Sequence, residues 1–183
     1  MAPKEALMFL ENFLPTWLLE SIYVLTPDRL KDLQVKGIIT DLDNTILAWN
    51  QPDVTKELEE WVNTMQANGI QVMILSNNNK KRVRRVADPL GIPYYHSARK
   101  PFRKGLRYLL GESDLNEAEV IYVGDQLLTD IWVSNRQGIR SVLVRPILDT
   151  DIIWTKLNRK VENWIFSRLQ SKYTELKWRD HID

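Results

Sequence analysis

The stretch Gly37 to Trp49 reads GIITDLDNTILAW, and it decides the fold. The β-branched residues at 38–40 predict a short buried strand. That strand runs straight into Asp41 and Asp43, two carboxylates two residues apart. In an open α/β sheet, ligands bind outside the carboxyl ends of the strands. A hard cation such as Mg²⁺ would offset the cost of placing two acids there, whereas an Asx turn with two solvated acids is the plain structural alternative.

Polar residues also follow later strands of the chain. We predict these strands over 70–75, 94–96, 119–123 and 141–144. The first ends at Ser76 and Asn77, directly before a helix whose N-terminus can bind an anion. The second is followed by Lys100, and the third by Asp125, with Asp130 five residues further on. Each has an ordinary explanation by itself, since a serine can cap a helix and a lysine can lie on the surface.

Helical patterns separate the strands. They cover 56–68, 80–88, 102–111 and 131–137. The alternation of strand and helix predicts an α/β fold with a single doubly wound parallel sheet, in which all the polar strand ends share one edge. The intervals from Asp43 to Ser76 and from Ser76 to Lys100 are each used up by one helix and one strand. An inserted domain has no room there, so we expect an open site.

The two ends of the chain have a different pattern. Residues 5–19 place apolar side chains at helical spacing, with Pro15 expected to kink or end the helix. The tail carries a second apolar stripe, many basic residues and three of the seven tryptophans. Both segments fit either packing on the core or lying on a membrane surface. We therefore divide the chain into a helical extension at 1–35, a core at 36–148 and a basic amphipathic tail at 149–183.

The composition is that of a globular protein. Of 183 residues, 44% are hydrophobic and 27% are charged, and no apolar run approaches the roughly 20 residues that span a bilayer. The absence of cysteine excludes disulfides and thiolate chemistry, and two histidines argue against a histidine-based metal site. The N-terminus lacks a signal-peptide pattern, so we expect a cytoplasmic protein.

The middle of the chain is strongly basic. Residues 61–110 contain ten lysines and arginines against a single acid, Asp88. Such a field attracts phosphate groups or an anionic membrane, although solvated helix faces also explain it. The aromatic interleaving typical of single-strand binding is missing, so nucleic acid is not an expected partner.

Together the polar strand ends carry a resemblance. Asp41-Leu-Asp-Asn-Thr45, Ser76-Asn77, Lys100-Pro101 and Gly124-Asp-Gln-Leu-Leu-Thr-Asp130 resemble the four motifs of the haloacid dehalogenase (HAD) phosphohydrolases, subfamily IIIA, over about residues 36–145. The strings ITDLDNT, LSNN, ARKP and GDQLLTD are similar to the YqeG-type HAD group. That group is in turn similar to the mitochondrial and plastid phosphatidylglycerophosphate phosphatases.

The resemblance implies a role for each motif residue. Asp41 would be the nucleophile that forms an aspartyl-phosphate, and Asp43 the general acid and base. Ser76 and the backbone N–H of Asn77 would hold phosphoryl oxygens, and Lys100 would neutralise charge on the phosphoryl group and on Asp41.

The remaining implied roles concern a cofactor. Mg²⁺ would be held by Asp41, by the backbone carbonyl of Asp43 and by Asp125. Asp130 would support the metal from the second sphere or through water.

The implied reaction is the Mg²⁺-dependent hydrolysis of phosphatidylglycerophosphate to phosphatidylglycerol. The partner would be a phospholipid at an anionic membrane surface, with the protein peripheral on the inner face and with segments 80–88 and 99–107 as its surface contacts. Three alternatives stay open: a capless phosphatase for a soluble phosphomonoester or phosphoprotein, a non-catalytic HAD-like binding module, and phosphotransfer to an acceptor other than water.

Overall fold

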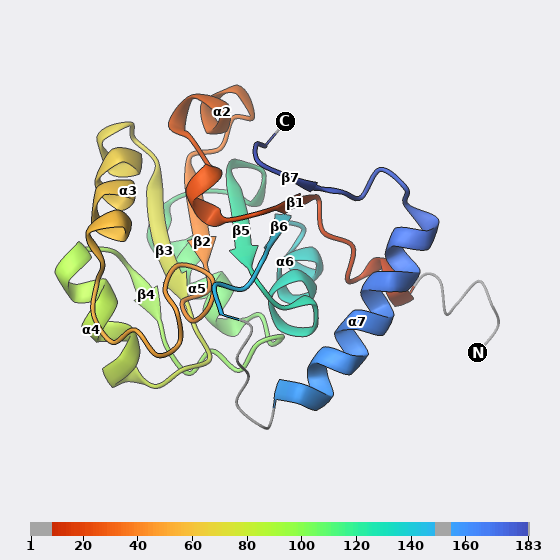
Figure 1. The fold of residues 1–183 in the computed structure, drawn as a ribbon. Coiled ribbons are helices and arrows are strands. Elements are labelled where there is room, and N and C mark those ends of the chain that lie inside the picture. The colour runs from red at the N-terminus through yellow and green to blue at the C-terminus, as the bar shows by residue number, and fades with distance from the viewer. Residues whose placement is uncertain (1–8, 149–154, 183) are drawn as a thin grey trace.

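The computed structural model describes residues 9–148 and 155–182, with the side chains of 155–159 excepted. Seven parallel strands form one open sheet in the order β4-β3-β2-β5-β6-β1-β7 (Figure 1). They are β1 Trp17–Leu19, β2 Gly37–Thr40, β3 Gln71–Leu75, β4 Tyr94–Tyr95, β5 Val120–Gly124, β6 Arg140–Val144 and β7 Trp178–Arg179. The α/β fold and all five predicted strands are confirmed.

Helices connect the strands. They are α2 Pro27–Asp32, α3 Lys56–Ala67, α4 Lys80–Leu90, α5 Lys104–Ser113, α6 Trp132–Gln137 and α7 Thr155–Lys172, with shorter helical turns at Ile22–Val24, Glu117–Glu119 and Leu127–Ile131. Local sequence explains where two of them start. The Thr55 hydroxyl accepts from the Leu58 amide at the start of α3, and Asn79 Oδ1 accepts from the Arg82 amide at the start of α4.

The sheet is buried on both faces because its strands are apolar at consecutive positions. Ile38 packs with the cluster formed by α2, α3 and α4, whereas its neighbour Ile39 packs with α5 and α6 on the opposite face. Figure 1 shows the three-layered arrangement that results. Both isoleucines have no exposed surface, so β2 is anchored from two sides and its carboxyl end is held firmly in place.

The order of the strands fixes where a ligand can bind. From β2 the chain moves outward to β3 and β4, and it then returns to β5 and β6 on the other side of β2. The gap between β2 and β5 is therefore the topological switch point, where open α/β sheets bind ligands. Asp41 follows β2 there and its amide donates to the Val123 carbonyl of β5. Residues 44–99 contain only α3, β3, α4 and β4 besides turns, so the expectation of no inserted cap is confirmed.

The terminal segments correct the sequence analysis. The expected helix over 5–19 is helical at 9–11, residues 5–8 lie outside the described part, and 17–19 form strand β1 between β6 and β7. Leu18 and Leu19 are both buried, and a run that is buried on two faces has no alternation that would separate strand from helix. Both ends of the chain thus complete the sheet that the core begins.

The helical pattern of the tail is confirmed by α7. Its residues Ile165 and Leu169 pack against Phe13 and Leu18 of the N-terminal segment. The part of the predicted stripe at 149–154 lies outside the described residues. None of the helices in the described ranges is long and apolar enough to cross a bilayer.

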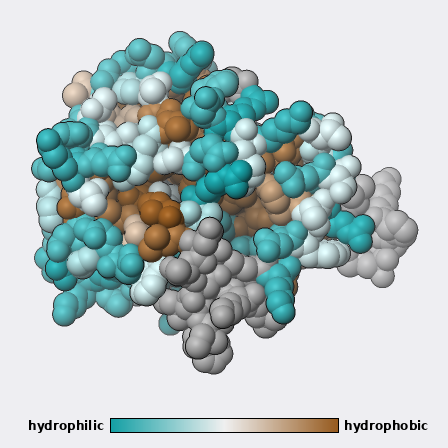
Figure 2. Space-filling view, in the orientation of Figure 1, coloured by the Kyte–Doolittle hydropathy of each residue, from teal (hydrophilic) through white to brown (hydrophobic). Residues whose placement is uncertain are grey.

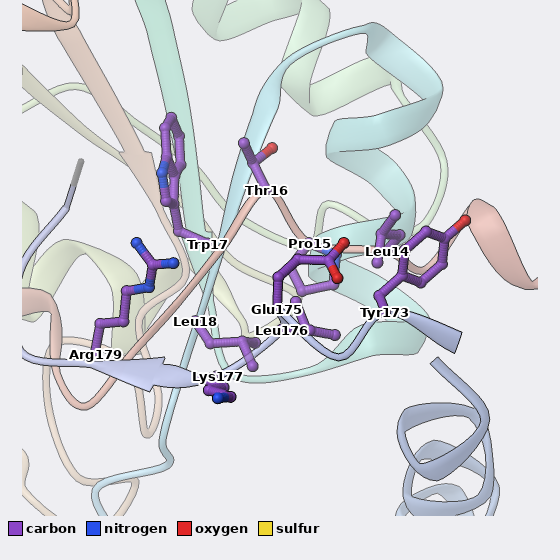
Figure 3. Close-up of a pocket in the computed structure, with 10 residues that line it drawn as sticks. All are labelled: Leu14, Pro15, Thr16, Trp17, Leu18, Tyr173, Glu175, Leu176, Lys177 and Arg179. Atoms are coloured by element: carbon purple, nitrogen blue, oxygen red, sulfur yellow. The ribbon is translucent and has the colours of Figure 1, made fainter. Parts of the chain in front are cut away.

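A groove of about 320 Å³ lies between the two terminal segments (Figure 3). Leu14 and Tyr173 lie side by side at one end of it in this view, and Trp17 and Arg179 at the other. Residues 14–16 precede β1, so the groove begins at the amino edge of the sheet. It is therefore separate from the carboxyl edge where the predicted site residues gather.

Candidate active site

The centre of the site is a buried cation between two carboxylates. Lys100 Nζ lies 2.6 Å from Asp41 Oδ1 and 2.6 Å from Asp130 Oδ1. The side chain of Lys100 is 2% exposed, and the hydroxyl of Tyr122 lies 3.3 Å from its Nζ. Sequence reasoning expected Lys100 beside Asp41, and the geometry agrees. The same lysine also binds Asp130 directly. The resemblance implied a different role for Asp130, as a residue that supports the metal from the second sphere or through water.

Burial shapes the protonation of this group. Burial, opposed by Lys100 and reinforced by Asp130, raises the pKa of Asp41 to about 7. Burial alone would lower the pKa of Lys100, but Asp130 and Asp41 outweigh it and hold that pKa well above its usual value. The two carboxylates therefore favour the charged form of Lys100, and a further positive charge near Asp41 would favour the ionised form of that acid.

Asp130 is fixed by its own turn. Its Oδ2 accepts from the Gln126 amide at 3.1 Å and its Oδ1 from the Tyr122 hydroxyl at 3.2 Å. Gly124 makes this packing possible, because a Cβ at that position would lie 2.4 Å from Cβ and Cγ of Asp130. The Gly124-Asp125 pair in the sequence thus has a steric reason beyond the aspartate itself.

The carboxylates form a group that could hold a cation. Oxygen atoms of Asp41, Asp125 and Asp130 lie within 4.8 Å of one another. Asp125 also accepts from the Thr45 hydroxyl at 3.1 Å, and burial together with Asp130 and Asp41 raises its pKa well above the usual value. Three hard oxygen donors with one lysine leave an excess of negative charge. That donor set fits Mg²⁺, which prefers carboxylate oxygens.

The side chain of Asp43 faces a different set of partners. Arg82 Nε donates to Asp43 Oδ1 at 3.0 Å, and Asn78 Nδ2 donates to Oδ2 at 2.9 Å. Arg82 is held in turn by the Pro52 carbonyl, to which Nη1 donates at 3.0 Å. Asp43 is more accessible than Asp41, with 22% of its side chain exposed against 9%. It is thus positioned as a group that could exchange protons at the mouth of the site.

Ser76 and Asn77 lie where β3 ends, as predicted. Ser76 Oγ accepts from the Asn78 amide at 3.0 Å within the turn before α4, whereas the cap of that helix is Asn79, so helix capping does not explain Ser76. The Ser76 hydroxyl still carries a proton to donate. Asn77 Oδ1 accepts from the Lys100 amide at 2.7 Å. The side chain of Asn77 therefore positions Lys100, while its backbone belongs to the turn that a phosphoryl oxygen would approach.

Sequence reasoning missed Arg82, Asn78 and Thr45. A signal for Arg82 was present, because positions 79, 82, 83, 86 and 90 share one face of α4 and Arg82 is the one charged residue on that face. An arginine on the core side of a first helical turn needs an acidic partner, and Asp43 is that partner. The side chains of Asn78 and Thr45 carried no such periodic signal.

Comparison with known proteins places this geometry in context. The family model described as mitochondrial PGP phosphatase matches residues 5–148. A "Probable phosphatase YqeG" from Bacillus subtilis is 42% identical over 94% of this chain and 100% of that protein. A "Probable phosphatidylglycerophosphatase, mitochondrial" from Schizosaccharomyces pombe is 28% identical over 76% of this chain and 72% of that protein.

A similar solved structure bears on the fold and on no other property of the chain. It is described as a "putative 3-deoxy-D-manno-octulosonate 8-phosphate phosphatase" from Vibrio cholerae, with a TM-score of 0.52 and 18% identity. The match covers 75% of this chain and 77% of that one.

Proposed function

The chain belongs to the mitochondrial PGP phosphatase family of HAD-fold phosphatases, and from that premise we propose that it hydrolyses phosphatidylglycerophosphate to phosphatidylglycerol and inorganic phosphate. The observation that carries the substrate is the family match over residues 5–148. The chemistry is supported separately by the buried pair of Asp41 and Lys100 at the switch point of the sheet.

Phosphate binding would use the groups around the end of β3. The phosphoryl oxygens of the substrate would accept from the Ser76 hydroxyl and from the backbone N–H of Asn77. Lys100 lies within 2.6 Å of Asp41 and would offset the negative charge that accumulates when a phosphate approaches a carboxylate.

Asp41 would attack the phosphorus atom through a carboxylate oxygen. A new O–P bond would form on Asp41 while the P–O bond to the glycerol headgroup breaks, giving an aspartyl-phosphate. Lys100 and Asp130 fix the orientation of Asp41 before the substrate arrives, since the lysine joins the two carboxylates.

Asp43 would move the protons. It would give a proton to the departing glycerol oxygen and then take one from the water that attacks the phosphorus, which releases phosphate and restores Asp41. Arg82 and Asn78 hold one oxygen each of the Asp43 carboxylate, so its orientation is set by two elements at once.

The residues that would hold Mg²⁺ are Asp41 and Asp125, with the Asp43 backbone carbonyl as the third group. When bound, the ion would supply positive charge that stabilises the phosphoryl group as its charge increases. Asp130, within 4.8 Å of the two carboxylates, would adjust that site while it holds Lys100.

A lipid substrate is also supported by the open surroundings of the site. No cap domain lies between β2 and β4, so a headgroup anchored in a bilayer can approach without being engulfed. The exposed basic residues of segment 61–110, among them Lys80, Lys81 and Lys104, provide charge that favours an anionic surface, in keeping with a peripheral protein on the inner face of a membrane.

The test is phosphate release from phosphatidylglycerophosphate in mixed vesicles, with and without Mg²⁺, beside a panel of soluble phosphomonoesters. We expect strong release from the lipid that depends on Mg²⁺. Release from the soluble esters alone would refute the lipid substrate and retain the phosphatase. Folded protein that releases phosphate from neither would refute the catalytic assignment and favour the binding module.

A further inference from the structure

We propose that the carboxyl edge of the sheet is the face that docks on an anionic phospholipid bilayer, a proposal that rests on the lipid substrate proposed above. The contact would consist of an apolar rim, formed by Trp49, Phe102 and Ile147, and of a cationic set, formed by Lys80, Arg99 and Lys104. Both sets belong to segments at the carboxyl edge of the sheet, the edge at which the site lies. Docking would therefore bring the phosphate of a lipid to Asp41 while its acyl chains stay in the membrane.

The apolar rim consists of large side chains that the fold leaves in solvent. Phe102 is 67% exposed, Ile147 43% and Trp49 41%. They follow β4, β6 and β2, so the parallel sheet places all three beyond its carboxyl edge. Phe102 stands two residues from Lys100, which ties the rim to the site.

Trp49 and Ile147 are joined to the turn that carries Asp43. The Trp49 amide donates to Asn44 Oδ1 at 3.3 Å, and the Ile147 amide donates to the Asn44 carbonyl at 3.0 Å. Asn44 follows Asp43 directly, so the backbones of these two exposed residues are hydrogen-bonded to the residue next to the acid. A polar turn alone would not require two large apolar side chains beside it in water.

The cations lie at the same edge for a topological reason. Helices that follow parallel strands run back across the sheet, so α4 and α5 begin at the carboxyl edge, at Lys80 and Lys104. Both lysines are exposed, and so is Arg99, which precedes the buried Lys100. The positive ends of the two helix dipoles add to their field. An anionic surface is the complement of this arrangement, because basic residues near such a surface each favour binding.

A groove extends the apolar rim. Its volume is about 460 Å³, and one wall is apolar, formed by Ile46, Leu47, Ala48, Ile147 and Leu148. The rest of the lining is more polar and consists of Ser21, Tyr23, Asn50, Gln51, Thr55 and Glu57. Figure 2 shows hydrophobic residues gathered over the loop that follows β2. This wall offers the upper part of an acyl chain an apolar surface next to the turn of Asp43.

The tail helix α7 is the competing membrane face. Its residues Ile165 and Leu169 are buried against the core, which leaves Val161 and Trp164 as the large apolar residues exposed on the described part of the helix. An interfacial helix needs its apolar face for the membrane, whereas Ile165, Phe166 and Leu169 in the described part of α7 pack on the protein. Trp164 is 54% exposed and so provides a matched control for Trp49 and Phe102.

The experiment is cosedimentation of the whole chain with vesicles of phosphatidylglycerol and phosphatidylcholine that contain no substrate. We expect the double variant Trp49→Ser/Phe102→Ser to bind roughly tenfold more weakly and Trp164→Ser to bind as wild type. Lys104→Ser should weaken binding roughly fivefold, and salt should weaken wild-type binding. Turnover of p-nitrophenyl phosphate by all of these variants should be unchanged, which confirms that they fold.

The opposite results would overturn the docking face. They are failure of the wild type to bind, unchanged binding by the double variant, or a loss caused by Trp164→Ser that equals or exceeds the loss caused by the double variant. Because the vesicles contain no phosphatidylglycerophosphate, this readout is independent of the substrate assay. A protein that docks and does not hydrolyse the lipid would refute the proposed function and leave the docking face standing.

Discussion

The guanidinium of Arg82 forms a salt bridge with the carboxylate of Asp43, with Nε 3.0 Å and Nη2 2.9 Å from Oδ1. Only 13% of the arginine side chain is exposed, and its Nη1 is anchored to the Pro52 carbonyl. Helix α4 and the loop after β2 thus meet on the residue to which we assign proton transfer. Arg82 is a positioning residue in this account, since it acts through Asp43.

Replacing Arg82 with alanine should lower kcat on a soluble phosphomonoester by about tenfold to a hundredfold, because a displaced acid loses part of its catalytic contribution. KM should change much less, since the proposed phosphate contacts at Ser76 and Asn77 would remain. Steady-state kinetics of Arg82→Ala check this. Arg84→Ala, which removes an exposed partner of Asp88 on the same helix, is the control and should match wild type. A higher KM with unchanged kcat would show that Arg82 binds substrate instead.

Replacing Lys100 with methionine should abolish turnover and destabilise the fold. Asp41 and Asp130 would face each other without their shared cation, and breaking a buried ion pair typically costs about 3–5 kcal/mol. Urea unfolding measures the loss, with Lys81→Met as the exposed control. A Lys100→Met protein as stable as wild type would contradict the assigned charge balance.

Gly124→Ala should disable the site without touching a predicted catalytic residue. The new methyl group would collide with Asp130, which must leave Lys100, and activity should fall at least about tenfold. Gly111→Ala is the matched control, because nothing lies within 4 Å of its Cβ position in α5. That control should gain up to about 1 kcal/mol of stability from its helical propensity. Normal activity of Gly124→Ala would refute the steric role.

Metal-free protein should lose stability as the pH rises. The pKa of Asp41 is raised to about 7 in the fold, above its unfolded value, so the folded state holds this proton more tightly. The stability from this group is complete below about pH 4 and disappears as the pH rises through about 7. Thermal unfolding between pH 4 and pH 8 checks this, and Asp41→Asn should give a flatter profile.

Added Mg²⁺ should stabilise the folded protein, and this stabilisation should increase as the pH rises. A cation competes with the protons on Asp41 and Asp125, so its stabilising effect should be larger at pH 8 than at pH 5.5. Equal increases in Tm at the two pH values would contradict a site built from these carboxylates.

The sequence was sufficient for the five adjacent strands β2 to β6, because β2, β3 and β5 are apolar runs that end in recognisable polar residues. It was also sufficient to bring Asp41, Lys100 and Asp125 to one edge, since parallel strands fix that edge. Strands β1 and β7 were missed, because three-residue and two-residue strands are defined by their pairing partners and carry little pattern of their own.

The position of Asp130 was partly foreseen. Its return toward Asp125 follows from the five-residue spacing, but its bond to Lys100 depends on how far two side chains from different elements reach across the switch point. The salt bridge between Arg82 and Asp43 likewise depends on the reach of side chains from different elements. Such contacts are set by tertiary packing and have no local signature beyond a charged residue on an apolar helix face.

The central claim is that Asp41 forms an aspartyl-phosphate. Its most direct test is chemical quenching of the enzyme during turnover of phosphatidylglycerophosphate that carries ³²P in its terminal phosphate. We predict an acid-stable label on Asp41 that hydroxylamine removes, with neither label nor phosphate release in a folded Asp41→Asn variant. Phosphate release by Asp41→Asn at more than a trace of the wild-type rate, or a label on another residue, would contradict the account.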